Sequence, residues 1–113
     1  RARADANFAA LQAWIDRTDW VENLVAEPAA RSNTSVCLKI VDPEIAGRDE
    51  AAQRDFVKKL TKLLETEAAA YDIGGYRDAP PGLRVWCGTT VETADIVALT
   101  GWLDWAFATL KAA

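Results

Sequence analysis

The sequence predicts one α+β domain spanning residues 1–113, a two-layer sandwich in which helices cover one face of a small antiparallel or mixed sheet. Two observations lead to this fold class. Three segments carry apolar residues at helical spacing, and short runs between them alternate apolar and polar residues as strands do. The 113 residues are enough for one core, and a composition of 50% hydrophobic and 27% charged residues is typical of a folded protein.

The first half of the chain predicts one helix and two strands. Residues 4–17 predict an amphipathic helix, because apolar residues recur three and four positions apart: Phe8, Leu11 and Ile15, with Trp14 beside them. Residues 20–25 predict a short strand. In residues 34–41 ("TSVCLKIV") every second residue is apolar, which is the pattern of a strand with one apolar face. Asp42-Pro43 then ends that strand or begins a helical turn.

The second half predicts two longer helices with a pair of strands between them. Residues 50–69 predict a helix whose lysine-rich side faces water and whose buried stripe is Phe56, Leu60, Leu63 and Leu64. Residues 70–76 ("AYDIGGY") predict a strand ending at a glycine pair, and residues 82–88 ("GLRVWCG") predict its neighbour. Thr89 and Glu92 form a capping-box pattern that should begin the last helix. The apolar face of that helix comprises Ile96, Leu99, Leu103, Ala106, Phe107 and Leu110.

Composition narrows the classes of function. The net charge is −4 with no basic patch, so nucleic acid is a poor candidate partner, and no apolar run is long enough to span a bilayer. The chain has no histidine, which excludes an imidazole base, a Cys/His pair and a histidine metal site. The chain lacks methionine and begins Arg-Ala-Arg, so we expect it to be a piece of a longer protein.

The two cysteines, Cys37 and Cys87, both fall in predicted strands. Two half-buried free thiols fit a reducing cytoplasm. A disulfide between adjacent strands is the alternative.

The second strand of the predicted pair places a guanidinium in an otherwise apolar stretch. Side chains alternate along a strand, so Leu83, Val85 and Cys87 should point to the helices while Arg84 and Trp86 point to the opposite face. An arginine there suits a carboxylate ligand, because its planar fork matches both carboxylate oxygens. The alternative is an ordinary exposed sheet face on which the arginine lies over Trp86. The pattern alone leaves both interpretations open.

Three stretches together resemble a known family: "RSNTSVCLKIVD", "YDIGGYRDAPPGLRVWCGTTVE" and "ALTGWLDWAF". In order and spacing they are similar to the C-terminal small domain of phosphoserine aminotransferases, which are fold-type I, class V enzymes dependent on pyridoxal phosphate. The resemblance implies that one sheet face closes over the active site of a large domain. It implies that Gly82-Leu83-Arg84 matches a Gly-hydrophobic-Arg pattern in which the arginine grips the substrate α-carboxylate. It also implies that Arg77 helps to hold the substrate phosphate, with Tyr76 standing where the family commonly has histidine.

The resemblance further implies what the whole enzyme would do. It would transfer an amino group between glutamate and 3-phosphohydroxypyruvate, giving 2-oxoglutarate and O-phosphoserine in serine biosynthesis, as a cytoplasmic homodimer. Pyridoxal phosphate would be bound by the large domain, so no catalytic, cofactor or metal residue is assigned in this chain, and we expect the isolated chain to be inactive. Two alternatives remain. One is a non-catalytic regulatory or dimerisation module that binds through its open sheet face. The other is the small domain of another class V aminotransferase, which would need Arg84 but not Arg77.

Overall fold

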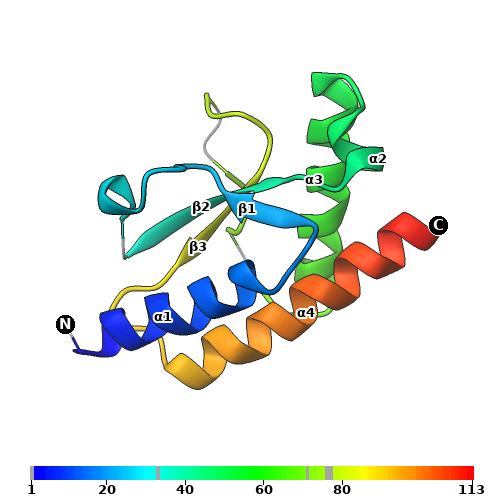
Figure 1. The fold of residues 1–113 in the computed structure, drawn as a ribbon. Coiled ribbons are helices and arrows are strands. Elements are labelled where there is room, and N and C mark those ends of the chain that lie inside the picture. The colour runs from blue at the N-terminus through cyan, green and yellow to red at the C-terminus, as the bar shows by residue number, and fades with distance from the viewer. Residues whose placement is uncertain (1, 33, 71, 76–77) are drawn as a thin grey trace.

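The computed structural model describes residues 2–32, 34–70, 72–75 and 78–113, and it is a two-layer α+β domain (Figure 1). Three antiparallel strands form an open sheet in the order β1-β2-β3, and the long helices lie on one side of it, which confirms the predicted fold class. The elements are α1 (Ala2–Asp16), β1 (Val21–Asn23), a 3-10 turn (Pro28–Ala30), β2 (Ser35–Ile40), α2 (Pro43–Ala46), α3 (Glu50–Thr66), β3 (Leu83–Trp86) and α4 (Thr93–Ala112).

The register of the sheet separates two faces. Val36 of the central strand β2 lies opposite Val85 of β3, and Leu38 lies opposite Leu83. All four side chains are buried beneath the helices. The alternate positions carry Ser35 opposite Trp86 and Cys37 opposite Arg84, on the face that the described helices leave uncovered. The predicted alternation of both strands is therefore confirmed.

An aromatic cluster joins the helices to the sheet. Trp20, just before β1, stacks on Phe107 of α4 with ring centroids 4.2 Å apart, and Trp14 of α1 meets Trp20 edge-on at 5.8 Å. Phe56 of α3 meets Phe107 edge-on at 5.7 Å. These rings tie three helices and the entry to the sheet into one core.

Asp104 of α4 completes this cluster with a polar contact. The indole N–H groups of Trp14 and Trp20 donate hydrogen bonds to its two carboxylate oxygens, each at 2.9 Å. Both tryptophans are almost fully buried, so the one carboxylate satisfies two donors that would otherwise lack a partner in the core.

The predicted strand at residues 70–76 is wrong. The described part of that segment forms only an isolated bridge, in which Gly74 lies opposite Leu83. The Arg84 N–H donates to the Ile73 carbonyl at 2.8 Å, so the two segments are neighbours as expected. Asp72 has a φ of 54°, and this left-handed residue turns the chain before a strand can extend.

Two predicted helix ends also differ. The helix predicted for residues 50–69 ends at Thr66, because Ala68 adopts a left-handed φ of 55°. The capping box of Thr89 and Glu92 is wrong: α4 begins at Thr93 with Glu92 at the N-cap, and no side chain caps it.

The prediction that both thiols are free is confirmed and the disulfide alternative is wrong, but only one of the two thiols is half-buried as predicted. Cys37 is half-buried on the uncovered sheet face, whereas Cys87 is buried in the core on the helical side. Among the described residues, no helix combines the length and apolar character needed to cross a membrane.

Candidate functional site

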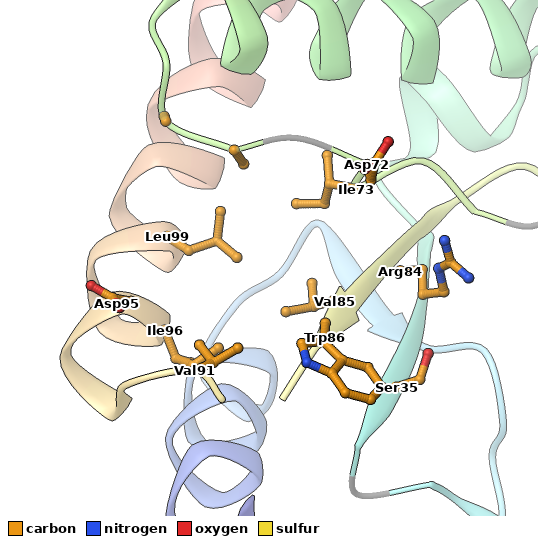
Figure 2. A pocket seen from close by; sticks show the side chains of 12 residues that line it. Ser35, Asp72, Ile73, Arg84, Val85, Trp86, Val91, Asp95, Ile96 and Leu99 are labelled. Carbon is orange, nitrogen blue, oxygen red and sulfur yellow. The ribbon is translucent and has the colours of Figure 1, made fainter. Parts of the chain in front are cut away.

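The candidate site is the uncovered side of β2 and β3, here called the open sheet face and defined by Ser35, Cys37, Arg84 and Trp86. Arg84 is half-buried, and Trp86 is 55% exposed. Figure 2 shows the Arg84 side chain on the opposite side of β3 from Val85. The structure thus places Arg84 where strand alternation predicts it, on a surface that a ligand can reach.

Gly82 sets the position of Arg84. A Cβ atom built on Gly82 would lie 2.1 Å from the carbonyl oxygen of Leu38, so only glycine lets this part of the chain pass so close to β2. That approach immediately precedes the pairing of Leu38 with Leu83 and of Cys37 with Arg84. The glycine in the Gly82-Leu83-Arg84 sequence therefore has a structural reason, which is to fix the register that presents the arginine.

The loop after β3 holds the Trp86 ring in place. A Cβ atom on Gly88 would lie 2.4 Å from the six-membered ring of Trp86, so the glycine makes room for the indole. The indole N–H donates to the Thr90 hydroxyl at 3.4 Å. The open sheet face thus presents a cationic group and, two residues along the strand, an aromatic group held by its own loop.

A cavity of about 490 Å³ lies beside β3, between the end of α3 and the start of α4. Figure 2 shows its apolar wall, which includes Val91, Ile96 and Leu99, on the side of β3 away from the Arg84 guanidinium. Asp72 and Asp95 also line it. Arg84 and Trp86 are also among the residues that line it, and they connect it to the open sheet face.

Arg84 gives the site its chemistry. A guanidinium stays charged at any physiological pH and binds a carboxylate or phosphate with two parallel hydrogen bonds. Elsewhere on the same sheet, Lys39 Nζ lies 4.0 Å from a carboxylate oxygen of Glu22, so these two charges offset each other. The arrangement can bind and orient an anionic group.

The described residues do not fit the role of a pyridoxal phosphate site. Lys39 pairs with Glu22, and Lys111 donates to Asp42 at 2.7 Å. That contact lowers the pKa of the Asp42 carboxyl and raises the pKa of the Lys111 ammonium group. The other lysines, Lys58, Lys59 and Lys62, are exposed on α3. Within the described ranges, no cluster of three or more His, Cys, Asp or Glu side chains is placed to hold a metal ion.

Of the three site residues predicted from the sequence, the structure places Arg84. Arg77 and Tyr76 lie outside the described residues, so their proximity to Arg84 stays a prediction.

Asn7 of α1 is a residue that the sequence analysis missed. Its side chain is fully buried, and its amide nitrogen lies 2.7 Å from the Val91 carbonyl oxygen and 3.2 Å from that of Gly88. Its amide oxygen accepts a hydrogen bond from the Thr93 hydroxyl at 2.5 Å. Asn7 therefore shapes the loop that holds Trp86. The available signal was an asparagine four residues before Leu11, inside the apolar stripe of the first helix.

Comparison with known proteins identifies the relationship. No family model matches the chain. A phosphoserine aminotransferase from Methanosarcina mazei is 40% identical over 109 residues, which are 96% of this chain and 27% of that protein. The chain is related to phosphoserine aminotransferase. A phosphoserine aminotransferase from Methanosarcina barkeri is 41% identical over 109 residues, with the same shares of both chains. These matches confirm the predicted resemblance, and the chain spans about a quarter of the length of these relatives.

Proposed function

We propose that this chain is the C-terminal small domain of a phosphoserine aminotransferase and carries part of its substrate site. The whole enzyme transfers an amino group between glutamate and 3-phosphohydroxypyruvate, giving O-phosphoserine for serine biosynthesis. Identity of 40% over nearly the whole chain supports the family, and one structural observation supports the role. That observation is Arg84, half-buried on the open sheet face in the register that Gly82 fixes.

Arg84 binds the substrate α-carboxylate in this proposal. Two parallel hydrogen bonds from the guanidinium fix the plane of the carboxylate and so the torsion of the adjacent Cα. Arg77 binds the substrate phosphate, which selects phosphoserine over serine or alanine. Tyr76 neighbours it in sequence, where it can contribute one hydroxyl donor.

The large domain of the whole enzyme holds pyridoxal phosphate in this proposal, and the cofactor supplies the electron sink for the carbanion at Cα. The residues of this chain bind the substrate, orient it and help to exclude water. The enzyme is a cytoplasmic homodimer. The isolated 113-residue chain lacks an assigned cofactor lysine, so we expect it to turn over no phosphoserine.

The test uses the full-length protein that carries this sequence, loaded with pyridoxal phosphate. The absorption spectrum of the cofactor is followed after adding O-phosphoserine or alanine, for wild type, Arg84→Leu and Arg77→Leu. We expect Arg84→Leu to lose about 100-fold in kcat/KM with both donors, because a charged hydrogen-bond pair disappears. We expect Arg77→Leu to lose activity mainly with phosphoserine. Lys58→Leu, on the solvent side of α3, is the matched control and should behave as wild type.

The outcomes separate the alternatives. A wild-type cofactor that responds to alanine but not to phosphoserine would indicate another class V aminotransferase. A protein that binds no cofactor and responds to neither donor would favour the non-catalytic module. An Arg84→Leu variant with wild-type kcat/KM would refute the carboxylate role.

A further inference from the structure

Ser35 of β2 places a hydroxyl group on the open sheet face, next to Arg84. In the register of the sheet Ser35 lies opposite Trp86, and Cys37, two positions along β2, lies opposite Arg84. Ser35 and Arg84 are therefore diagonal neighbours on one face, a separation of about 7–8 Å that a long side chain spans. Figure 2 shows both side chains on the same side of the sheet, with the Ser35 oxygen turned toward the guanidinium.

The hydroxyl groups just before Ser35 have structural tasks. The Ser32 hydroxyl accepts hydrogen bonds from the backbone N–H groups of Thr34 and Ser35, each at 3.2 Å. The Thr34 hydroxyl oxygen lies 3.1 Å from that of Ser32. These contacts shape the turn that leads into β2, as serine and threonine hydroxyls commonly do.

The Ser35 hydroxyl has no such task. Within residues 2–32, 34–70, 72–75 and 78–113, no side-chain or backbone group forms a hydrogen bond with it. Its side chain is half-buried. The donor of this hydroxyl is therefore available to a ligand on the open sheet face.

Ser35 also lies between two cavities. It lines the cavity of about 490 Å³ together with Arg84 and Trp86, and it lines a second cavity of about 330 Å³ together with Cys37 and Arg31. Among the described residues, no other residue lines both of these cavities. A group in contact with the Ser35 hydroxyl therefore has open space on two sides.

The Trp86 ring lies beside Ser35 and reduces its contact with water (Figure 2). The ring is held from the other side by Gly88 and by the Thr90 hydroxyl. A hydrogen bond to a charged acceptor is stronger where water is partly excluded. The position next to Trp86 thus favours a charged acceptor for the Ser35 hydroxyl.

A carboxylate fits this pair of donors. It offers about four acceptor sites on its two oxygens, and the fork of one arginine takes two of them. A serine hydroxyl can donate to a third site without adding a charge. Because Arg84 and Ser35 belong to different strands, the two side chains would hold a carboxylate from two directions.

We infer that Ser35 is a further substrate-binding residue, whose hydroxyl donates a hydrogen bond to the α-carboxylate held by Arg84. The inference rests on the proposed function, in which Arg84 binds that carboxylate. The long Arg84 side chain can swing, whereas the short Ser35 side chain is fixed to the central strand of the sheet. Ser35 thereby limits the orientation of the carboxylate and of the Cα atom attached to it.

The test uses the full-length protein loaded with pyridoxal phosphate, with O-phosphoserine or alanine as the donor. Ser35→Ala should lower kcat/KM about tenfold with both donors, because one hydrogen bond to a charged group is lost. The loss should appear mainly as a higher KM, because amino transfer leaves the carboxylate unchanged. Ser35→Thr keeps the hydroxyl and should recover most of the loss. Thr66→Ala removes a hydroxyl that bonds to the Lys62 carbonyl on α3, and this matched control should behave as wild type.

Two further measurements separate contact with the carboxylate from an effect on the sheet. In an Arg84→Leu background, Ser35→Ala should add little further loss, because the carboxylate is no longer held beside the hydroxyl. O-Phosphoethanolamine has the amine and the phosphate but no carboxylate, so it should inhibit wild type and Ser35→Ala equally. Circular dichroism checks that each variant is folded.

Four results would overturn the inference. A wild-type KM in Ser35→Ala, with Arg84→Leu impaired, would remove Ser35 from the site and leave the proposed function standing. Losses that multiply in the double variant, with weaker inhibition by phosphoethanolamine, would mean that Ser35 acts through the shape of the sheet. A loss with phosphoserine alone would place Ser35 at the phosphate. Wild-type kcat/KM in both Ser35→Ala and Arg84→Leu would refute the carboxylate role of Arg84 and this inference with it.

Discussion

Replacing Asn7 by alanine tests whether one buried amide builds the loop beside the candidate site. The Asn7 amide nitrogen lies 2.7, 3.2 and 3.3 Å from the carbonyl oxygens of Val91, Gly88 and Cys87. The amide has two hydrogens, so Val91 takes one and the other two carbonyls share the second. The amide oxygen accepts a third hydrogen bond, from Thr93.

The hydrogen bonds of Asn7 give the size of the expected loss of stability. Two donated bonds and one accepted bond, at about 1 kcal/mol each, predict a loss of about 3 kcal/mol in the free energy of unfolding. For a domain of this size, about 4 °C of Tm is lost per kcal/mol, so Tm should fall by about 12 °C. Both values are large for a single substitution on a helix.

Urea unfolding, followed by tryptophan fluorescence and circular dichroism, measures the loss. Asn7→Asp keeps the shape but turns a donor into an acceptor that faces three carbonyl oxygens, so it should be at least as unstable as Asn7→Ala. Gln12→Ala is the matched control on α1, because Gln12 is only partly buried. The free energy of unfolding of this variant should fall by about 1 kcal/mol. A free energy of unfolding for Asn7→Ala within 1 kcal/mol of wild type, or an Asn7→Asp as stable as wild type, would refute the reasoning.

Variants at Asp104, Cys87 and Gly82, with Gly74→Ala as a control, test other contacts by the same unfolding assay. The free energy of unfolding should fall by about 2–4 kcal/mol in Asp104→Ala, because two buried indole donors lose their acceptor. In Asp104→Asn it should fall by about half of that. Burial raises the pKa of the Cys87 thiol from 9.0 to about 11, so the unfolded chain ionises first and stability should fall as pH rises from 9 to 11. The Cys87→Ala variant should show a flatter pH profile. The free energy of unfolding should fall by more than about 2 kcal/mol in Gly82→Ala, because the added methyl group would clash with the Leu38 carbonyl. In Gly74→Ala the added methyl group meets nothing within 4 Å, so the free energy of unfolding should change little.

A specific result would contradict each of these expectations. An Asp104→Ala variant as stable as wild type would mean that water replaces the carboxylate at the two indoles. Equal pH profiles for wild type and Cys87→Ala would mean that the thiol titrates normally in the fold. Equal stabilities for Gly82→Ala and Gly74→Ala would mean that the sheet can shift away from the added methyl group.

The sequence predicted the elements whose form depends on spacing alone. The apolar stripe of α3 and the alternation of apolar and polar residues in β2 and β3 are local periodic patterns. Which side chains of these three elements are buried follows from those patterns. The face of Arg84 was predictable for the same reason, since its direction is fixed by its position relative to Leu83 and Val85.

The rest depended on contacts between segments far apart in the chain. The start of α4 is organised by Asn7, which is 86 residues away from Thr93, so the local pattern of Thr89 and Glu92 does not predict how the helix begins. The segment around Ile73 pairs with β3 but turns at Asp72, which has a left-handed backbone that is uncommon outside glycine even though aspartate adopts it more often than most residues. The exposed side of α4 could not be recognised before the structure showed which of its apolar residues the core does not use.

The register between β2 and β3 links folding to recognition. A slip of one residue would turn Arg84 into the core and leave Leu83 and Val85 in water, because side chains alternate along the strand. Burying the guanidinium in the apolar core and exposing two core residues would prevent the domain from folding. Chains with that slip would not reach the folded state. Folding of the sheet and presentation of Arg84 on the open sheet face are therefore one requirement, and every chain that folds carries the arginine on that face.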